Sequence, residues 1–179
     1  MSMSKIYALL LLLAASSANA TQYYFSQTGF EEGAYISGSF QATDLNGDGA
    51  YVGSIFSNFS EISDFSLSFS GNSIASAFTQ SLADLTYLDY NASRSVIGDA
   101  NPEGIATRWF ETSGFSYVSG VGPNGRQGGD VINWTTGASS ETGNLITVST
   151  SAPVPLPGAL GLFVPALVGL LGLSRRKHA

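Results

Sequence analysis

The stretch Phe65-Ser66-Leu67-Ser68-Phe69-Ser70 alternates large apolar residues with serines. Successive side chains of a β-strand point to opposite faces, so a period of two places every apolar residue of this run on one face and every serine on the other. The apolar face must be buried. The stretch therefore predicts a strand with one face in a hydrophobic core.

Shorter segments of the same kind recur along the middle of the chain. They are rich in aromatic or β-branched residues and lie at 23–26, 34–40, 107–111, 115–118, 131–134 and 145–148. Turn signals rich in Gly, Asn and Asp separate them, at 45–49, 71–72, 98–102, 122–125, 128–129 and 142–144. Residues 75–88 suit a helix or a strand, and we favour a strand. The pattern predicts an all-β fold, a single antiparallel sandwich or jelly-roll-like domain over residues 21–146.

The charges of the 179-residue chain are divided unevenly. Residues 21–153 hold three arginines and all 13 acidic residues, a net charge of −10, and contain no Lys, His or Cys. The absence of Cys excludes disulfides and thiolate metal sites. The negative charge disfavours binding to nucleic acid.

The amino end has the three parts of a secretory signal peptide. Lys5 precedes an apolar run at 6–15, and small residues at Ala18 and Ala20 suit the −3 and −1 positions of a signal-peptidase site. The apolar run is short for a membrane span of about 20 residues. We predict cleavage after Ala20, so that residues 1–20 direct export and Thr21 begins the mature chain.

The carboxyl end also has three parts. The motif Val154-Pro155-Leu156-Pro157-Gly158 precedes an uncharged, apolar segment at 156–173, and residues 174–179 contain the basic cluster Arg175, Arg176 and Lys177. The apolar segment is about long enough to cross a bilayer as a helix. The basic cluster would stay in the cytoplasm and leave the acidic middle outside. Residues 147–153 are small, polar and uncharged, which predicts a spacer between domain and membrane.

This carboxyl end resembles the PEP-CTERM sorting signal of Gram-negative bacteria in its VPLP-type variant. The resemblance covers residues 154–179, and Leu156 stands where many members have Glu. It implies Sec-dependent export, transient anchoring in the inner membrane, and processing by an exosortase, a membrane-embedded transpeptidase. It further implies delivery to the cell surface or release into an exopolysaccharide-rich biofilm matrix.

One loop matches the first half of a calcium-binding motif. Asp44, Asn46 and Asp48 occupy positions 1, 3 and 5 of D-x-N-x-D-G, but the second half of the motif lacks its carboxylate. Glu61 or Asp64 from a neighbouring strand could complete a weak calcium site. The preferred interpretation is a β-turn, because Asn-Gly and Asp-Gly are strong hairpin signals.

Catalytic chemistry has little support in the sequence. Without His or Lys in residues 21–153, a nucleophilic serine lacks its usual general base. The acids Asp99, Glu103, Glu111 and Asp130 could supply a glycosidase-type pair, although their spacing selects none, and solvated surface acids are the preferred interpretation. We therefore predict no catalytic residues.

The function expected from these features is that of an exported surface or matrix protein with a structural or adhesive role. The first alternative is a carbohydrate-binding module, in which aromatic side chains would stack on sugar rings. Its candidates are Trp109, Trp134, Tyr87, Tyr90 and Tyr117, although aromatic residues on strands more often belong to the core. Burial of both tryptophans would exclude that alternative. A carboxylate-dependent hydrolase is the second alternative.

Overall fold

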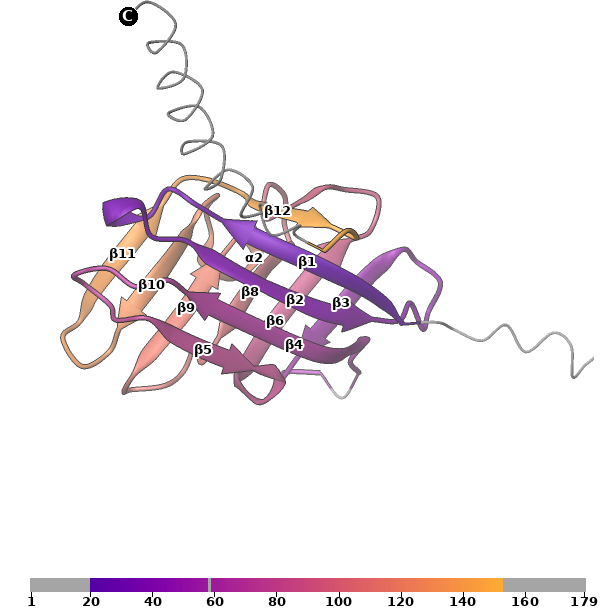
Figure 1. Ribbon diagram of the computed structural model, residues 1–179. Helices are drawn as coiled ribbons and strands as arrows, with labels where there is room; N and C mark the ends of the chain where they lie inside the picture. Colours follow the sequence, from indigo (N-terminus) through magenta and orange to yellow (C-terminus); the bar gives the residue numbers. More distant parts are fainter. Residues whose placement is uncertain (1–19, 58, 153–179) are drawn as a thin grey trace, which may run out of the picture.

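The computed structural model describes residues 20–57 and 59–152, and these residues form two antiparallel β-sheets that pack face to face (Figure 1). This arrangement confirms the prediction of an all-β fold. The remainder of the predicted signal peptide and the predicted sorting signal at 154–179 lie outside the described residues. No helix within the described part of the chain is both long and apolar enough to cross a membrane.

Each sheet has six strands. In spatial order, sheet A contains β5 (Phe78–Ser81), β4 (Ile62–Phe69), β2 (Ile36–Ala42), β1 (Thr21–Gln27), β12 (Ile146–Ser149) and β7 (Val96–Ile97). Sheet B contains β11 (Ala138–Thr142), β10 (Gly129–Asn133), β9 (Phe115–Ser119), β8 (Gly104–Thr107), β6 (Leu85–Asn91) and β3 (Ala50–Ser54). Short helical turns are η1 (Glu31–Gly33), η2 (Leu82–Asp84) and α2 (Val121–Asn124).

The core lies between the sheets and is largely aromatic. Phe65, Leu67 and Phe69 of β4 are 1–2% exposed, while the serines between them face solvent, as the alternation predicts. The rings of Phe25 and Phe65 stack at a centroid distance of 5.8 Å within sheet A. Across the core, the Phe40 ring meets the Tyr90 ring of sheet B edge to face at 5.9 Å. Aromatic burial therefore holds the two sheets together without a disulfide.

A buried polar network also joins the sheets. The Tyr117 hydroxyl of β9 donates to the Gln27 Oε1 of β1 over 2.6 Å, and the Gln27 Nε2 donates to the Ser119 Oγ over 2.9 Å. All three residues are at most 1% exposed. Because a buried polar group without a partner is costly, these bonds favour one relative position of the two sheets.

Two sequence predictions need correction. Only Thr107 of the strand predicted at 107–111 belongs to a strand, β8; Arg108 has a left-handed φ of 49° and the chain turns there. The spacer predicted at 147–153 begins inside the fold, because Thr147 to Ser149 are part of β12 and pair with β1. The domain therefore extends to Ser149 instead of 146.

The ends of the domain lie close together. Strand β1 begins at Thr21, and Ser149 at the end of β12 pairs with Tyr24 near the start of β1. The first and last strands are neighbours in the middle of sheet A. Both predicted sorting segments therefore join the domain at the same end of one sheet.

Candidate functional site

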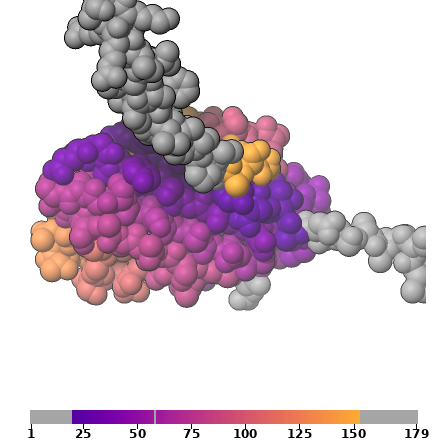
Figure 2. Space-filling model, viewed as in Figure 1, coloured from indigo at the N-terminus to yellow at the C-terminus, as the bar shows by residue number. Residues whose placement is uncertain are grey.

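The outer face of sheet A carries two rows of hydroxyl side chains. The strand register aligns one residue from each of β12, β1, β2, β4 and β5 in each row, and together the rows contain Ser149, Tyr24, Ser39, Ser66 and Ser81, then Thr147, Ser26, Ser37, Ser68 and Thr79. Each of these ten residues bears a hydroxyl group, and none is charged. We call this surface the hydroxyl face. Figure 2 views the molecule from this side, with β1, β2, β4 and β5 forming the surface in indigo and magenta.

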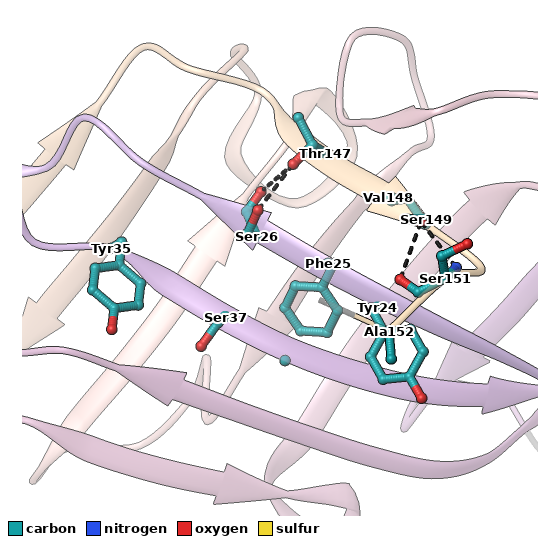
Figure 3. A pocket seen from close by; sticks show the side chains of 11 residues that line it. Tyr24, Phe25, Ser26, Tyr35, Ser37, Thr147, Val148, Ser149, Ser151 and Ala152 are labelled. Carbon is teal, nitrogen blue, oxygen red and sulfur yellow. Dashed lines mark hydrogen bonds between the residues drawn. The ribbon is translucent and has the colours of Figure 1, made fainter. Parts of the chain in front are cut away.

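A shallow hollow of about 490 Å³ lies on the hydroxyl face between β12, β1 and β2 (Figure 3). Tyr24 and Tyr35 lie toward its two ends, and Ser26 and Thr147 share a hydrogen bond of 3.0 Å at its border. Ala152, the last described residue, also lines it. The hollow is lined mainly by carbon atoms, and its polar groups are hydroxyls, so it suits an uncharged ligand.

The second distinctive surface is one end of sheet B. The ends of β3, β8 and β10 and the start of β6 all lie there, as the antiparallel register requires. Among the described residues, five of the eight exposed large hydrophobic side chains are next to these strand ends: Ile55, Phe56, Leu82, Phe110 and Trp134. We call this surface, with the half-buried Trp109, the aromatic end.

The aromatic side chains of this surface contact one another across loops. The rings of Phe56 and Phe110 meet edge to face at a centroid distance of 5.5 Å, although 54 residues separate them in the chain. The Trp109 ring stacks on Phe110 at 5.3 Å. Phe56 and Phe110 remain 65% and 63% exposed. A cluster of aromatic rings left open to solvent by a folded domain is a candidate binding site.

A charged group lies at the base of these rings. The Arg108 Nη1 lies 3.9 Å from the Asp84 Oδ1, and its Nη2 lies 3.7 Å from the Glu111 Oε2. Neither contact is short enough for a hydrogen bond. The Arg108 Nε is buried and has no hydrogen-bond partner within residues 20–57 and 59–152. These three side chains, with Ile55 and Phe110, line a hollow of about 260 Å³.

Trp134 extends the aromatic end along the sheet. Its backbone N–H donates to the Gly114 carbonyl over 2.9 Å, and its Nε1 donates to the Ser116 Oγ over 3.0 Å. Gly114 lies in the same loop as Phe110. Trp134 follows β10, two strands along from β8, so it lies about 10 Å further along the end of the sheet.

The predicted calcium loop is closed by hydrogen bonds to its own backbone. The Asp44 Oδ1 accepts from the Gly47 N–H over 2.6 Å, and the Asp48 Oδ1 accepts from the Ala50 N–H over 2.8 Å. Asn46 donates from its Nδ2 to the Asp48 Oδ2 over 2.8 Å.

Of the two further calcium ligands proposed from the sequence, Glu61 reaches this loop. Its carboxylate accepts from the Leu45 and Val52 N–H groups over 2.8 and 3.0 Å. Asp64 instead accepts from the neighbouring Phe65 N–H. Residues 20–57 and 59–152 contain no group of three acidic or histidine side chains placed to hold a metal ion. Calcium binding stays a prediction.

The acids considered for hydrolysis separate into different places. Glu111 belongs to the aromatic end, and Asp130 pairs with Arg126 near β11. Asp99 and Glu103 do lie near each other, because Arg94 forms ion pairs with both. Burial raises the pKa of Glu103, and the neighbouring Asp99 raises it further, while the charge of Arg94 lowers it.

The aromatic candidates divide between core and surface. Tyr90 and Tyr117 are 2% and 0% exposed, so they belong to the core. Tyr87 is half-buried, and its hydroxyl donates to the Pro102 carbonyl over 2.7 Å. Trp109 is half-buried and Trp134 is 36% exposed. The condition that would have excluded a carbohydrate-binding module, burial of both tryptophans, is therefore not met.

The aromatic end was missed as a unit at the level of sequence. Its signal is that Ile55-Phe56 and Trp109-Phe110 are adjacent apolar pairs, which break the period of two, so both members of a pair cannot face one core in a regular strand.

Of the residues assigned to sorting, Ala20 is described and exposed, whereas Ala18, the motif and the basic cluster lie outside the described residues. Comparison with protein-family models, curated proteins and solved structures found no match to this chain.

Proposed function

We propose that this chain is an exported protein of the cell surface or extracellular matrix, with a structural or adhesive role. Signal peptidase removes residues 1–20, the segment at 156–173 holds the chain in the inner membrane, and an exosortase processes it at the motif 154–158. The domain that reaches the outside then acts by binding, and no catalytic residues are assigned.

The observation that carries this proposal is the position of the domain within the chain. The first strand begins at Thr21, the residue after the predicted cleavage site, and the last strand ends at Ser149, five residues before the predicted motif. Because β1 and β12 are interior strands of sheet A, the described fold extends over nearly the whole interval between the two predicted sorting segments. This is what export followed by tail processing requires.

The hydroxyl face supports the adhesive role. Its two rows present ten hydroxyl groups and no charged side chain, in a domain whose net charge is −10, and the exposed Asp64 lies beside Ser66 on the same side of β4. Hydroxyls both donate and accept hydrogen bonds, so such a face can contact hydrated neutral material without electrostatic repulsion.

Fractionation of cells with and without the exosortase tests the proposal. With the enzyme present, an antibody to the domain should detect the protein in the outer fractions and the medium. Without it, the protein should stay with the inner membrane. The double variant Pro155→Ala and Pro157→Ala should behave as if the enzyme were absent, because the extended conformation imposed by the prolines is lost.

Deletion of Lys177 from the basic cluster is a matched control, since it alters the tail and leaves the motif intact. Release into the medium without the enzyme, or normal release of the double-proline variant, would contradict the proposed route. A protein that remains in the cytoplasm with residues 1–20 attached would contradict export itself.

The aromatic end favours a second candidate, a carbohydrate-binding module. Phe56, Phe110 and Trp134 expose their rings at one end of sheet B, where side chains of both charges accompany them. The two candidates are compatible, because a matrix protein can adhere by binding polysaccharide.

A further inference from the structure

We propose that the aromatic end of sheet B is a binding site for a chain of uncharged sugars, a neutral polysaccharide. Its ligand-binding groups are Phe56, Trp109, Phe110 and Trp134, with Arg108, Asp84 and Glu111 at the base. The inference deepens the proposed function, since it identifies the surface and the class of ligand through which an exported adhesive domain would act.

The charges of the site select an uncharged ligand. Arg108 lies between two carboxylates, those of Asp84 and Glu111, so the group of three has a net charge of −1. The domain around it has a net charge of −10. An anionic polymer or an anionic lipid surface would be repelled by both. A neutral ligand avoids this cost.

The hydrogen-bonding capacity of the same three residues selects hydroxyl groups. The guanidinium of Arg108 is 3.9 and 3.7 Å from its two carboxylates, so its donors and their acceptors are close but not bonded to each other. A hydroxyl group can accept from the guanidinium and donate to a carboxylate at the same time. Sugars carry such groups beside apolar C–H faces, which can stack on the exposed rings of Phe56 and Phe110.

The extent of the aromatic end favours a chain over a single sugar. Phe56, Trp109 and Phe110 form one cluster, and Trp134 lies about 10 Å further along, two strands away from β8. A ligand that contacts both the cluster and Trp134 must be elongated. Affinity should therefore increase with the length of the oligosaccharide until both regions are occupied.

Binding measured on the purified full-length chain tests the inference. The chain is kept in a detergent without a sugar headgroup and titrated with neutral gluco-, manno- and galacto-oligosaccharides of increasing length, and with anionic alginate. We expect binding to at least one neutral series, tighter binding with length, and none to alginate. Failure of every neutral series, or preference for alginate, would overturn the proposal.

Variants locate the site. Phe110→Ser and Trp134→Ser each remove an exposed ring, and each should weaken binding of a long oligosaccharide by at least about tenfold. Trp134→Ser should also abolish the gain in affinity with length, which a general loss of structure would not do selectively. Leu45→Ser is the matched control, because Leu45 is 58% exposed and lies in the loop before β3, away from the aromatic end. Equal binding by all three variants would contradict the assignment.

Two other occupants of an apolar surface give different results. Association with vesicles of phosphatidylcholine that Phe110→Ser abolishes, without sugar binding, would identify a lipid surface and overturn the proposal. A dimer that Phe110→Ser dissociates, without sugar binding, would identify a second copy and overturn it as well. The binding experiment uses the purified chain and does not depend on export. An absence of sugar binding would therefore not affect the conclusion from fractionation, and an absence of export would not affect the conclusion from the binding experiment.

Discussion

At the scale of single residues, the buried carboxyl of Glu103 affects how stability depends on pH. Burial raises the pKa of Glu103 in the folded protein, and its Oε2 has no hydrogen-bond partner in the described chain. A raised pKa means that the folded state binds the proton more tightly than the unfolded state. The stabilising effect of this proton is complete below the unfolded pKa of about 4.3 and is lost as pH rises through the folded pKa.

Glu103→Gln should therefore be more stable than the unmodified protein at neutral pH, because the amide resembles the protonated acid at every pH. The advantage should decrease toward pH 4. Urea unfolding followed at several pH values measures it, and Asp64→Asn, on the exposed side of β4, controls for the loss of one acidic charge. A Glu103→Gln protein that is less stable at neutral pH would show that the ion pair with Arg94 outweighs burial.

Asp44 is predicted to stabilise its loop through the backbone. Its two carboxylate oxygens accept from the Gly47 and Gly49 N–H groups over 2.6 and 3.0 Å. Asp44→Ala leaves both donors without this partner and should lower the free energy of unfolding by about 1–2 kcal/mol. Urea unfolding in EDTA should give this loss in full.

Calcium is tested in the same experiment. Addition of about 5 mM calcium is suited to weak extracellular sites. If the loop is only a hydrogen-bonded turn, calcium should not change the loss of unfolding free energy caused by Asp44→Ala. A stabilisation by calcium that Asp44→Ala removes would contradict the turn and establish the metal site at Asp44, Asn46 and Asp48.

At the level of secondary structure, the question is whether the residues of β12 stabilise the fold as a strand or only link it to the tail. Ile146 and Val148 are 0% and 8% exposed, and β12 lies between β1 and β7. A chain that ends at Leu145 loses both side chains from the core, each contributing about 1.5–3 kcal/mol, and exposes the edge of β1. Against a total stability of about 5–15 kcal/mol, we expect that chain to aggregate or unfold.

Circular dichroism and urea unfolding of two truncated chains measure this effect. The chain that ends at Ala152 should unfold cooperatively, whereas the chain that ends at Leu145 should not. Ile146→Asp in the full chain gives an independent check, since it places an unpaired charge in the core. Equal unfolding midpoints for both truncated chains would restore residues 147–153 as a spacer.

How well each element could be predicted from sequence depended on its burial pattern. Strand β4 buries Phe65, Leu67 and Phe69 on one face and exposes serines on the other, so the alternation in its sequence predicted the strand correctly. Residues 75–88 contain β5, the turn η2 and the start of β6, and this short turn between two strands is the reason that the segment suited a helix as well as a strand. The aromatic residues Trp109 and Phe110 led to the prediction of a strand after Thr107, but they lie in a loop, and Phe110 is exposed. Tertiary structure sets their exposure, so the local sequence could not indicate it.

At the scale of the whole molecule, the chain contains one domain between two predicted sorting segments. The acidic loop, including Asp44 and Asp48, could be found from its motif, because its residues are consecutive. The aromatic end could not, because Phe56, Phe110 and Trp134 become neighbours only through the order of strands in sheet B. Local motifs are present in the sequence, whereas a site assembled from three loops requires the fold.

Export followed by removal of the tail can be read from the intact mass of the protein in the medium. We expect a species that begins at Thr21 and ends near Val154-Pro155-Leu156-Pro157, present only in cells that have the exosortase. A membrane-bound species that retains residues 156–179 in cells with and without the enzyme would contradict it and would identify the tail as a permanent anchor.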